Sequence, residues 1–383
     1  MEHQYVRAMG QEIAERIPDV HKIAVLRANA LGDFIFTLPA LEALRAAYPN
    51  AEIVLLAKAW HAAFLANRPS PIDRVVVIPA YGGVSEEPGI EENPLELERF
   101  FKAMQREHFD LAFQLHGGGN HSNPFTQQLG ARMTIGLKAP DAVPLDRWIP
   151  YIYFQHEILR YLEVVSLAGA TTTMLEPHIS VTRQDLLEGS RIVPEGNKPL
   201  VALHPGASDP GRRWAVENFA AVGDALASAG AQVVVTGTAD ERDLVDDVVN
   251  AMQAEALGLG GCLSLSGLAG LLSRCRVVVA NDTGPLHLAR AVGAATVGIY
   301  WCFNLVNMGP ITRSRHRLAV SWQLICPICG TDRSRTHCPH QASFVNTIST
   351  DEVIGSALDL LASGIDRADK TAVQYVREVG SIH

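Results

Sequence analysis

The most informative stretch of this sequence is Val277-Val278-Val279-Ala280-Asn281-Asp282-Thr283-Gly284-Pro285-Leu286-His287-Leu288-Ala289. An apolar run typical of a buried strand leads there into a short polar turn and then into a helix. The first turn of a helix leaves backbone N–H groups without partners and lies at the positive end of the helix dipole, which suits a phosphate at Thr283 and Gly284. An ordinary capped helix after a core strand explains the same residues equally well.

Length and composition narrow the class of protein. The chain has 383 residues, 48% of them hydrophobic, which exceeds the size at which a single core usually stops growing, so two domains are expected. A net charge of -9 argues against a nucleic-acid partner. No apolar run approaches the roughly 18 residues of a membrane span, and the start of the chain lacks the basic and apolar regions of a signal peptide. We therefore predict a soluble, cytoplasmic protein.

Strand-type and helix-type segments alternate along both halves of the chain, a pattern typical of parallel α/β sheets. In the first half, strands are predicted at 22–26, 52–57, 74–78 and 110–115, with helices at 37–48 and 94–106. In the second half, strands are predicted at 200–204, 232–236, 276–280 and 296–300. The sequence therefore predicts two Rossmann-like halves.

A polar stretch near the middle of the chain, within Thr182–Pro199, marks the expected domain boundary. We expect an N-terminal domain over 1–190 and a C-terminal domain over 191–349. The remaining segment, 350–383, is predicted to be a helix up to Ala362 followed by a loosely held polar tail. The glycine- and glutamate-rich stretch Pro79–Asn93 predicts a mobile loop.

The second half offers a further anion-binding turn after its first strand. His204-Pro205-Gly206-Ala207-Ser208 precedes Arg212-Arg213-Trp214, which together supply a glycine for close approach, a hydroxyl and a guanidinium suited to phosphate. The two strands that end at this turn and at Asp282-Thr283-Gly284 are expected to be neighbours, so a diphosphate fits between the turns. The alternative is an ordinary loop with two solvent-facing arginines.

Another strand of this half ends in Thr236-Gly237-Thr238-Ala239-Asp240-Glu241. An acidic side chain at this edge can accept hydrogen bonds from a ribose. Whichever of Asp240 and Glu241 does not point inward is expected to cap the next helix.

The first half presents a carboxylate after its first strand, in Arg27-Ala28-Asn29-Ala30-Leu31-Gly32-Asp33. Asp33 is the candidate general base, able to take the proton of a hydroxyl as its oxygen attacks an electrophilic carbon. Asp33 is also well placed to cap the helix that follows, and taken alone the capping role is the simpler interpretation.

Together these residues resemble glycosyltransferase family nine, the ADP-heptose:lipopolysaccharide heptosyltransferases. The resemblance rests on Leu31-Gly32-Asp33, His204 to Ser208 with Arg212-Arg213-Trp214, Gly237 with Asp240-Glu241, and Asn281 to His287, and it runs from about Lys22 to the last helix. It implies the GT-B architecture, an α/β fold with two Rossmann-like parallel-sheet domains facing across a cleft. It places the donor nucleotide in the C-terminal half and the acceptor in the N-terminal half, and implies an inverting transfer without a catalytic metal.

By position, the resemblance implies that Asp33 is the catalytic base. It implies a donor site at His204, Gly206, Ser208, Arg212, Arg213, Gly237, Asp240, Glu241, Asp282, Thr283, Gly284 and His287, with Ser208, Arg212, Thr283 and Gly284 around the diphosphate. Well-known members carry a lysine before the tryptophan, so the choice between Arg212 and Arg213 stays open. The ribose contact likewise stays open between Asp240 and Glu241.

The acceptor side is predicted in Phe113–Pro124, a strand end followed by three glycines that allow a sugar to approach the backbone. His116, Asn120 and Asn123 are the candidate acceptor-binding residues, and a loop without a ligand is the alternative. The aromatic residues Trp148, Tyr151, Tyr153 and Phe154 suit an acceptor groove, a membrane-facing edge or, more simply, core. The basic run Arg313, Arg315 and Arg317 is predicted to be solvated surface.

Six cysteines in a chain of cytoplasmic character suggest thiols or a metal site. Cys326-Pro327-Ile328-Cys329 is a short-spaced chelate, and a tetrahedral structural site is expected at Cys302, Cys326, Cys329 and Cys338, with His337 and His340 as spare ligands. Structural zinc or iron and free thiols are equal alternatives. No cofactor is expected for catalysis.

We therefore predict an inverting glycosyltransferase that moves a heptose or a related sugar from ADP-heptose to a saccharide acceptor, in lipopolysaccharide or related glycan biosynthesis. The acceptor is either soluble or lipid-linked, and a lipid-linked acceptor would bring the enzyme to the inner membrane surface. The alternatives are a nucleotide-sugar epimerase or hydrolase of the same architecture and a non-catalytic nucleotide-sugar binding subunit. NAD-dependent chemistry lacks the expected glycine fingerprint after Leu26 or Leu203.

Overall fold

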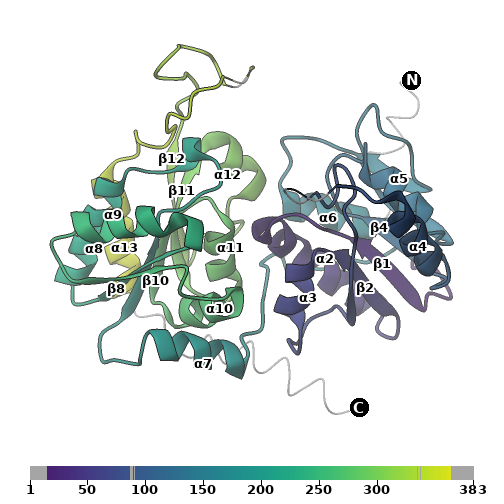
Figure 1. The fold of residues 1–383 in the computed structure, drawn as a ribbon, viewed down its shortest axis with the longest axis horizontal. Coiled ribbons are helices and arrows are strands. Elements are labelled where there is room, and N and C mark those ends of the chain that lie inside the picture. The colour runs from purple at the N-terminus through teal and green to yellow at the C-terminus, as the bar shows by residue number, and fades with distance from the viewer. Residues whose placement is uncertain (1–14, 87–88, 90, 334, 337, 364–383) are drawn as a thin grey trace.

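The computed structural model describes residues 15–86, 89, 91–333, 335–336 and 338–363. They form two lobes, each built on one parallel sheet with helices, which lie side by side in Figure 1. Within the described ranges, no helix combines the length and the apolar character needed to cross a membrane. The predicted polar tail, most of the segment tested for a signal peptide, and His337 lie outside the described residues.

The N-terminal lobe holds a six-stranded sheet in the order β3-β2-β1-β4-β5-β6, with every neighbouring pair parallel. Its strands are β1 (Lys22–Leu26), β2 (Glu52–Ala57), β3 (Arg74–Val77), β4 (Leu111–Gln114), β5 (Met133–Lys138) and β6 (Arg147–Pro150). Its helices are α2 (Leu31–Ala47), α3 (Ala59–Leu65), α4 (Pro94–Gln105), α5 (Ser122–Gln128) and α6 (Glu157–Ser166). After their first residues, Lys22 and Glu52, the strands β1 and β2 are apolar because helices cover both faces of the sheet.

The C-terminal lobe repeats this arrangement with the strand order β12-β11-β10-β7-β8-β9. Its strands are β7 (Leu200–His204), β8 (Gln232–Gly237), β9 (Ala256–Gly260), β10 (Val277–Asn281), β11 (Ala295–Trp301) and β12 (His316–Ser321). Its helices are α7 (Arg183–Ile192), α8 (Val216–Ser228), α9 (Arg242–Ala251), α10 (Leu265–Arg274), α11 (Gly284–Ala291), α12 (Cys302–Met308) and α13 (Thr350–Ala362), with 3₁₀ turns η1 (Pro210–Arg212) and η2 (Ala239–Glu241). Both lobes have the Rossmann strand order.

The predicted α/β class and the two Rossmann-like lobes are confirmed. Each strand predicted from the sequence is present, with its ends shifted by no more than one residue. The sequence missed β5, β6, β9 and β12, three of which lie at sheet edges, where β9 contains two glycines and β6 ends in proline. Helix α2 begins at Leu31 instead of Thr37, because Gly32 and Pro39 weaken the helical pattern in the sequence.

The connection between the lobes lies earlier than the predicted boundary at residue 190. Helix α7, placed mostly in the N-terminal domain by that prediction, packs against α10 of the C-terminal lobe. A Cβ on Gly189 would lie 2.9 Å from the backbone nitrogen of Leu271, and a Cβ on Gly270 would overlap the backbone of Asp185, so the two helices touch through their backbones. The transition therefore falls between α6 and α7, while α13 packs on α8 and joins the C-terminal lobe.

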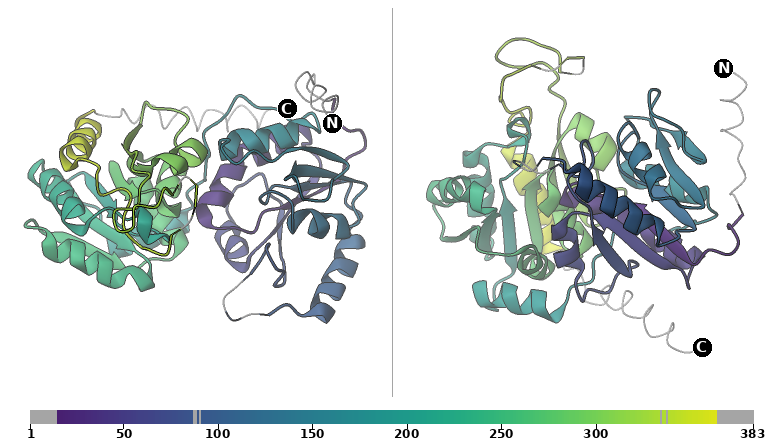
Figure 2. Two further views of the ribbon diagram at one scale, coloured as in Figure 1. Left: turned by 90° about the horizontal axis from the view of Figure 1, so that it is seen from above. Right: turned by 45° about the vertical axis from the view of Figure 1, so that its right-hand side comes forward.

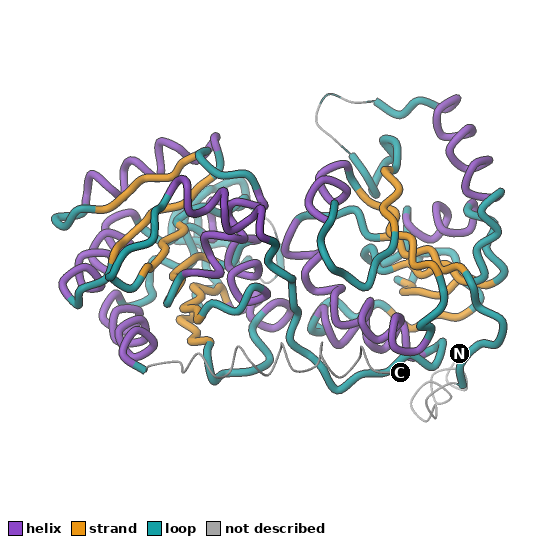
Figure 3. The backbone as a smooth tube through the Cα atoms, turned by 90° about the horizontal axis from the view of Figure 1, so that it is seen from below, coloured by secondary structure: helices purple, strands orange, loops and turns teal. Residues whose placement is uncertain are grey.

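Helices α2 and α11 form the main contact between the lobes. Phe34 and Phe36 of α2 and Leu286 of α11 belong to one buried apolar cluster that continues from one lobe into the other. A buried ion pair adds to this contact, since Arg68 donates to both carboxylate oxygens of Asp185, at 2.6 and 3.0 Å. Figures 2 and 3 show the same two-lobed shape from other sides.

Candidate active site

Each lobe has a switch point, where the chain leaves neighbouring central strands toward opposite sides of the sheet. In the N-terminal lobe β1 pairs with β4, and in the C-terminal lobe β7 pairs with β10. Loops after such strands diverge at the carboxyl edge and leave a crevice in which α/β proteins bind ligands. The neighbouring positions of β7 and β10 confirm that the two predicted anion-binding turns lie side by side.

Asp282, directly after β10, is buried and surrounded by hydrogen-bond donors. Its Oδ1 lies 3.1 Å from Nε2 of His287, and its Oδ2 accepts from Nη1 of Arg212 at 3.3 Å and from Nδ2 of Asn304 at 2.8 Å. Burial raises the pKa of Asp282, but His287, Arg212 and Asn304 outweigh burial, so the net pKa is lowered. Asp282 is therefore an anion at neutral pH that fixes three side chains around the crevice.

The two arginines before Trp214 have different partners. Arg212 spans the two turns, because its Nη2 donates to Oγ of Ser208 at 3.0 Å while its Nη1 reaches Asp282. Arg213 turns back to its own loop and donates from Nε to the carbonyl of Ala207 at 2.8 Å. The structure thus brings Ser208 and Arg212 together with Asp282 and leaves Arg213 beside them with a backbone partner.

The two acidic candidates after β8 also differ. Glu241 faces the turn after β7, where a Cβ on Gly206 would overlap its carboxylate, and a Cβ on Gly237 would lie 3.2 Å from the Cβ of Glu241. Its Oε2 also accepts the backbone N–H of Thr238 at 2.9 Å, which is a capping contact. Asp240 is exposed. Glu241 is therefore the carboxylate nearer to the crevice, although it caps the turn as well.

Two buried histidines, His204 and His287, line the floor of this region. Burial lowers the pKa of both imidazoles, so both are neutral at pH 7. Nδ1 of His204 lies 3.0 Å from the hydroxyl of Thr236, whereas Nδ1 of His287 is buried without a hydrogen-bond partner. A neutral His287 donates its Nε2–H to Asp282, which fixes the tautomer.

The N-terminal turns of α11 and α2 meet between the lobes. Thr283 is the N-cap of α11, and its hydroxyl makes no capping bond. Pro285 has no N–H and the N–H of Leu286 bonds to the carbonyl of Thr283 at 3.1 Å, so the N–H groups of Thr283 and Gly284 are those that can bind an anion. A Cβ on Gly284 would lie 3.1 Å from Cβ of Leu31, and a Cβ on Gly32 would lie 2.9 Å from Cδ2 of His287. These two glycines allow the first turns of α2 and α11 to touch, which brings Asp33 close to the turn after β10.

Asp33 is the third residue of α2, and each oxygen of its carboxylate has one contact. Oδ1 lies 3.1 Å from Nη2 of Arg27, and Oδ2 accepts the backbone N–H of Ala30 at 3.2 Å. Arg27 is 2% exposed at its side chain and is held by the carbonyl of Leu115, while the Asp33 side chain is 28% exposed. Asp33 therefore caps its helix and also keeps an open edge toward solvent between the lobes.

The predicted acceptor residues after β4 fall into different environments. Burial lowers the pKa of His116 to about 3, and its Nδ1 accepts the N–H of Ala28 at 3.3 Å. Asn123 is fully buried, and its amide donates to the carbonyls of Leu137 and Val143. Asn120 is exposed. The geometry leaves Asn120 accessible, whereas the N–H groups of Asn123 tie α5 to β5 and to the loop before β6.

A cavity of about 470 Å³ lies between the lobes. The N-terminal lobe contributes two aromatic residues, β11 and α12 contribute one wall, and the loop after β12 contributes the remainder. The lining residues are Tyr153, Phe154, Trp301, Phe303, Asn304, Asn307, Met308, Arg333, Arg335 and Thr336. Because Asn304 also donates to Asp282, the cavity adjoins the donor-side cluster.

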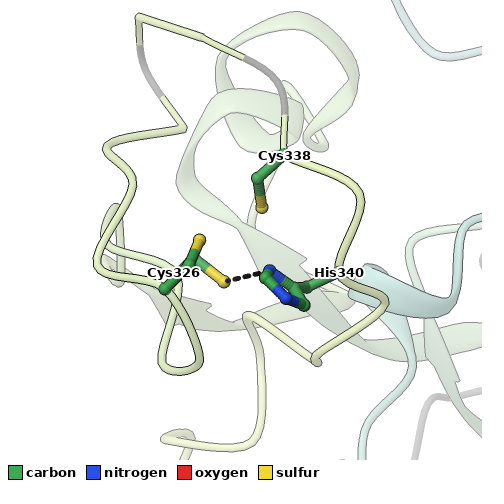
Figure 4. Close-up of side chains that lie close together, drawn as sticks. Cys326, Cys338 and His340 are labelled. Carbon is green, nitrogen blue, oxygen red and sulfur yellow. Dashed lines mark hydrogen bonds between the residues drawn. The ribbon is translucent and has the colours of Figure 1, made fainter.

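Three of the four predicted cysteine ligands come together in the loop between β12 and α13, the cysteine loop (322–333, 335–336 and 338–349), at the top of Figure 1. Ligand atoms of Cys326, Cys329, Cys338 and His340 all lie within 4.8 Å of one another, and Figure 4 shows Cys326, Cys338 and His340 converging. The prediction for Cys302 is wrong in geometry, because Cys302 begins α12 and lies outside this group.

The chemistry of the cysteine group suits a tetrahedral metal ion. Three thiolates and one imidazole are the donors of structural zinc and iron sites, and ligand atoms on one such ion lie about 3.8 Å apart. A hydrogen bond with the hydroxyl of Thr331 lowers the pKa of Cys329 to about 6, which favours the thiolate that a metal requires. Adjustments of about 1 Å would close the group around an ion.

Sequence reasoning missed three residues that organise the site: Arg27, Asn281 and Asn304. Asn281 is fully buried. Its side chain accepts the N–H of Trp214 at 3.1 Å and donates to the carbonyl of Pro205 at 2.7 Å, so it connects the end of β10 to the turn after β7. Arg27 directly follows β1, and Asn281 is the last residue of β10. A buried polar residue at the end of a mostly apolar central strand needs partners, and this was the signal in the sequence for both residues. Nothing in the local sequence distinguishes Asn304.

Two Rossmann-like lobes, with a carboxylate at one switch point and an anion-binding pair of turns at the other, define a glycosyltransferase of the GT-B architecture. The chain belongs to glycosyltransferase family 9 (heptosyltransferase), whose family model matches residues 97–334. It is 26% identical over 296 residues to lipopolysaccharide heptosyltransferase 2 of Salmonella typhimurium, covering 73% of this chain and 82% of that protein.

Solved structures of similar proteins have the same fold. The family 9 glycosyltransferase of Veillonella parvula is 22% identical with a TM-score of 0.77, covering 91% of this chain and 99% of that one. The ADP-heptose lipopolysaccharide heptosyltransferase II of E. coli is 18% identical with a TM-score of 0.68, covering 89% and 98%. The dodecameric iron-containing heptosyltransferase TibC, in complex with ADP-D-β-D-heptose, is 13% identical with a TM-score of 0.54, covering 90% and 77%.

Proposed function

We propose that this protein transfers a heptose from ADP-heptose to a hydroxyl of a saccharide acceptor, with inversion at the anomeric carbon, in lipopolysaccharide or related glycan biosynthesis. The observation that carries the proposal is the contact between the first turns of α2 and α11, which supports a transfer between Asp33 and the turns at Ser208 and Asp282–Gly284. The related heptosyltransferases named above support heptose as the transferred sugar and ADP as its carrier.

Asp33 acts as the general base in this proposal. The acceptor oxygen attacks the anomeric carbon as the bond from that carbon to the diphosphate oxygen breaks, and the acceptor proton passes to Asp33. The open edge of Asp33 suits this role, because an attacking hydroxyl needs to reach the carboxylate. Arg27 is a positioning residue, since it holds Oδ1 from a buried site and fixes where the carboxylate points.

The departing ADP is stabilised on the other lobe. Arg212 and the free N–H groups at Thr283 and Gly284 hydrogen-bond the diphosphate as negative charge builds up on it. A guanidinium that already spans both turns loses little freedom on binding, which strengthens this stabilisation. Glu241, near Gly206, is the proposed ribose contact, and no step requires a catalytic metal.

A donor screen tests this proposal directly. Calorimetry with ADP, UDP and GDP should give the tightest binding for ADP, and incubation with ADP-heptose and a heptose-deficient lipopolysaccharide core should release ADP and form an inverted linkage, seen in the anomeric NMR signals. Preference for UDP or GDP would contradict the heptosyl proposal. Release of free heptose with no glycoside product would instead indicate a hydrolase.

The cysteine group is proposed to hold a structural zinc or iron ion with no part in transfer chemistry. Its ligands are Cys326, Cys329, Cys338 and His340, all on one loop, and one related heptosyltransferase, TibC, is iron-containing. An ion there would order a loop that has no helix or strand of its own over its described residues. The proposed location of the enzyme is the cytoplasm, at the inner membrane surface when the acceptor is lipid-linked.

A further inference from the structure

The interlobe cavity contains polar groups that the proposed transfer chemistry does not use. Asn307 is 9% exposed and lines the cavity, and its Oδ1 is buried without a hydrogen-bond partner. An unpaired buried carbonyl oxygen is costly, and a hydroxyl donor from a ligand would satisfy it. The side chain thus points to a ligand rich in hydroxyl groups.

Aromatic rings from both lobes stand beside Asn307. Phe154 and Phe303 pack together across the lobes with ring centroids 5.6 Å apart, and Trp301 packs on Phe303 at 4.7 Å. Pockets for organic ligands combine apolar, aromatic walls with a few convergent polar groups, and flat rings suit the C–H faces of a sugar ring. The cavity therefore has the composition of a saccharide site.

The cysteine loop adds positive charge to this saccharide site. Arg333 and Arg335 both line the cavity, and the side chain of Arg335 is 85% exposed, so its guanidinium is available to a ligand despite a long contact of 3.7 Å to Asp332. Guanidinium groups bind phosphate and carboxylate through paired hydrogen bonds. An anionic saccharide matches the lining better than a neutral one.

The arginines are physically connected to the cysteine group. Arg333 donates its backbone N–H to Leu324 at 2.9 Å, and its guanidinium lies 3.7 Å from Sγ of Cys338 and 5.1 Å from the ring centre of Phe344. Residues Ile325 and Asp332 form a bridge that closes the turn carrying Cys326 and Cys329. The fold of this turn therefore sets the positions of Arg333 and Arg335 in the cavity wall.

We propose that the cavity is an acceptor subsite for a saccharide bearing a phosphate or carboxylate group, and that a metal ion on the cysteine group holds its arginine wall in place. The inference rests on the proposed function, in that the cavity adjoins the donor side through Asn304. Without the ion, the turn that carries Cys326 and Cys329 is no longer tied to Cys338 and His340, and the arginines that follow it lose their fixed position. The residues proposed to bind the diphosphate, Ser208, Arg212 and Asp282–Gly284, lie outside this loop.

Weak saccharide binding measured by saturation-transfer NMR, with ADP present, tests the ligand class. The probes are mannose 6-phosphate, glucuronate and mannose, which carry a phosphate, a carboxylate and no charge. We expect at least one of the two anionic sugars to bind about tenfold more tightly than mannose, and the stronger of the two identifies the anion. Equal binding of all three probes, or no binding of any, would overturn the anionic subsite.

A pair of arginine variants locates that binding. Arg335→Ala should weaken the preferred anionic sugar about tenfold and leave ADP affinity unchanged, while Arg313→Ala, which removes the same charge from an exposed position of the same lobe, should change neither. Weaker ADP binding in Arg335→Ala would mean that the cavity holds the donor sugar, which contradicts the inference. Equal effects of the two variants would reduce the role of Arg335 to general surface charge and also contradict it.

Metal removal tests the coupling. The full-length protein is treated with a chelator, metal content is measured by mass spectrometry, and zinc is restored; reconstitution with cobalt reports thiolate coordination by its visible absorption. The stripped protein should keep its ADP affinity and lose about tenfold in binding of the preferred sugar, with recovery on reloading. Sugar binding that is independent of metal content would overturn the coupling. Absence of ADP binding in every form would instead count against the proposed function itself.

Discussion

Asp33 and Asp282 follow central strands in the two lobes, yet their surroundings are opposite. Asp282 is 1% exposed and bound by His287, Arg212 and Asn304, whereas the side chain of Asp33 is 28% exposed and contacts Arg27 and one backbone N–H. A buried carboxylate held by three side-chain donors is poorly placed to accept a substrate proton, while a carboxylate with an open edge can do so. The contrast separates an organising carboxylate from a reacting one.

Removing the organising carboxylate should have the largest effect on the fold. Asp282→Ala leaves the Nε2–H of His287 without its partner and leaves Arg212 with the distant Asp209 as its carboxylate partner, so we expect a loss of about 3 kcal/mol in the free energy of unfolding by urea denaturation. ADP affinity should fall by at least about tenfold. Asp209→Ala is the matched control, because Asp209 is an exposed and distant partner of the same arginine, and it should cost less than about 1 kcal/mol. Equal losses would contradict the organising role.

The neighbouring residues Arg212 and Arg213 provide a second test of which side chains organise the site around Asp282. Arg212→Gln removes the side chain that spans both turns and should weaken ADP binding about 10- to 100-fold in calorimetry. Arg213→Gln loses a bond to the Ala207 carbonyl and should change ADP affinity by less than about threefold. The reverse order would move the phosphate contact to Arg213.

The contact between the lobes can be widened by one methyl group. Gly32→Ala places a Cβ 2.9 Å from Cδ2 of His287, so the first turns of α2 and α11 need to separate by a few tenths of an ångström. We expect the transfer rate to fall about tenfold, with ADP affinity unchanged because ADP binds on one lobe. An unaltered rate would mean that the spacing of Asp33 from the donor turn is not critical.

The buried His61, which packs against Phe34 next to Asp33, should make the N-terminal lobe less stable at acid pH. Burial lowers the pKa of His61 to about 3 from an ordinary 6.5, so the unfolded chain binds this proton first and stability falls as pH drops from 6.5 toward 3. His61→Leu should flatten this decline by roughly 2 kcal/mol in urea titrations at pH 7 and pH 4. His21→Gln, at an exposed position, is the control and should leave the slope unchanged. An unchanged slope in His61→Leu would contradict the assignment.

The strands around the switch points were predictable from sequence because their apolar runs end in polar turns. Ser208, Arg212 and Asp282 were predicted as site residues for the same reason, since they lie in the polar turns after buried strands, and the structure brings the three together. The division between the lobes was less predictable, because α7 has few apolar residues and is held by glycine contacts with α10 that no local pattern reveals. Asn304 reaches Asp282 only through tertiary packing.

The cysteine group shows the same limit. The Cys326–Cys329 spacing predicted that these two thiols lie close together, and the structure brings them onto one turn. The remaining ligand was misjudged, since Cys302 and His340 cannot be ranked by distance along the chain. The path of the loop after Cys338 decides which residue becomes the fourth member of the group, and it brings His340 beside the three cysteines.

The most direct test of the account is the transfer rate of Asp33→Asn measured alongside its ADP affinity. The substitution keeps the size of the side chain and removes its ability to take a proton. Single-turnover transfer should fall by about 10²- to 10⁴-fold, while ADP affinity and the urea midpoint stay within error of the unchanged protein. Unchanged turnover, or a loss of ADP binding as large as the loss of rate, would contradict the assignment of Asp33 as the base.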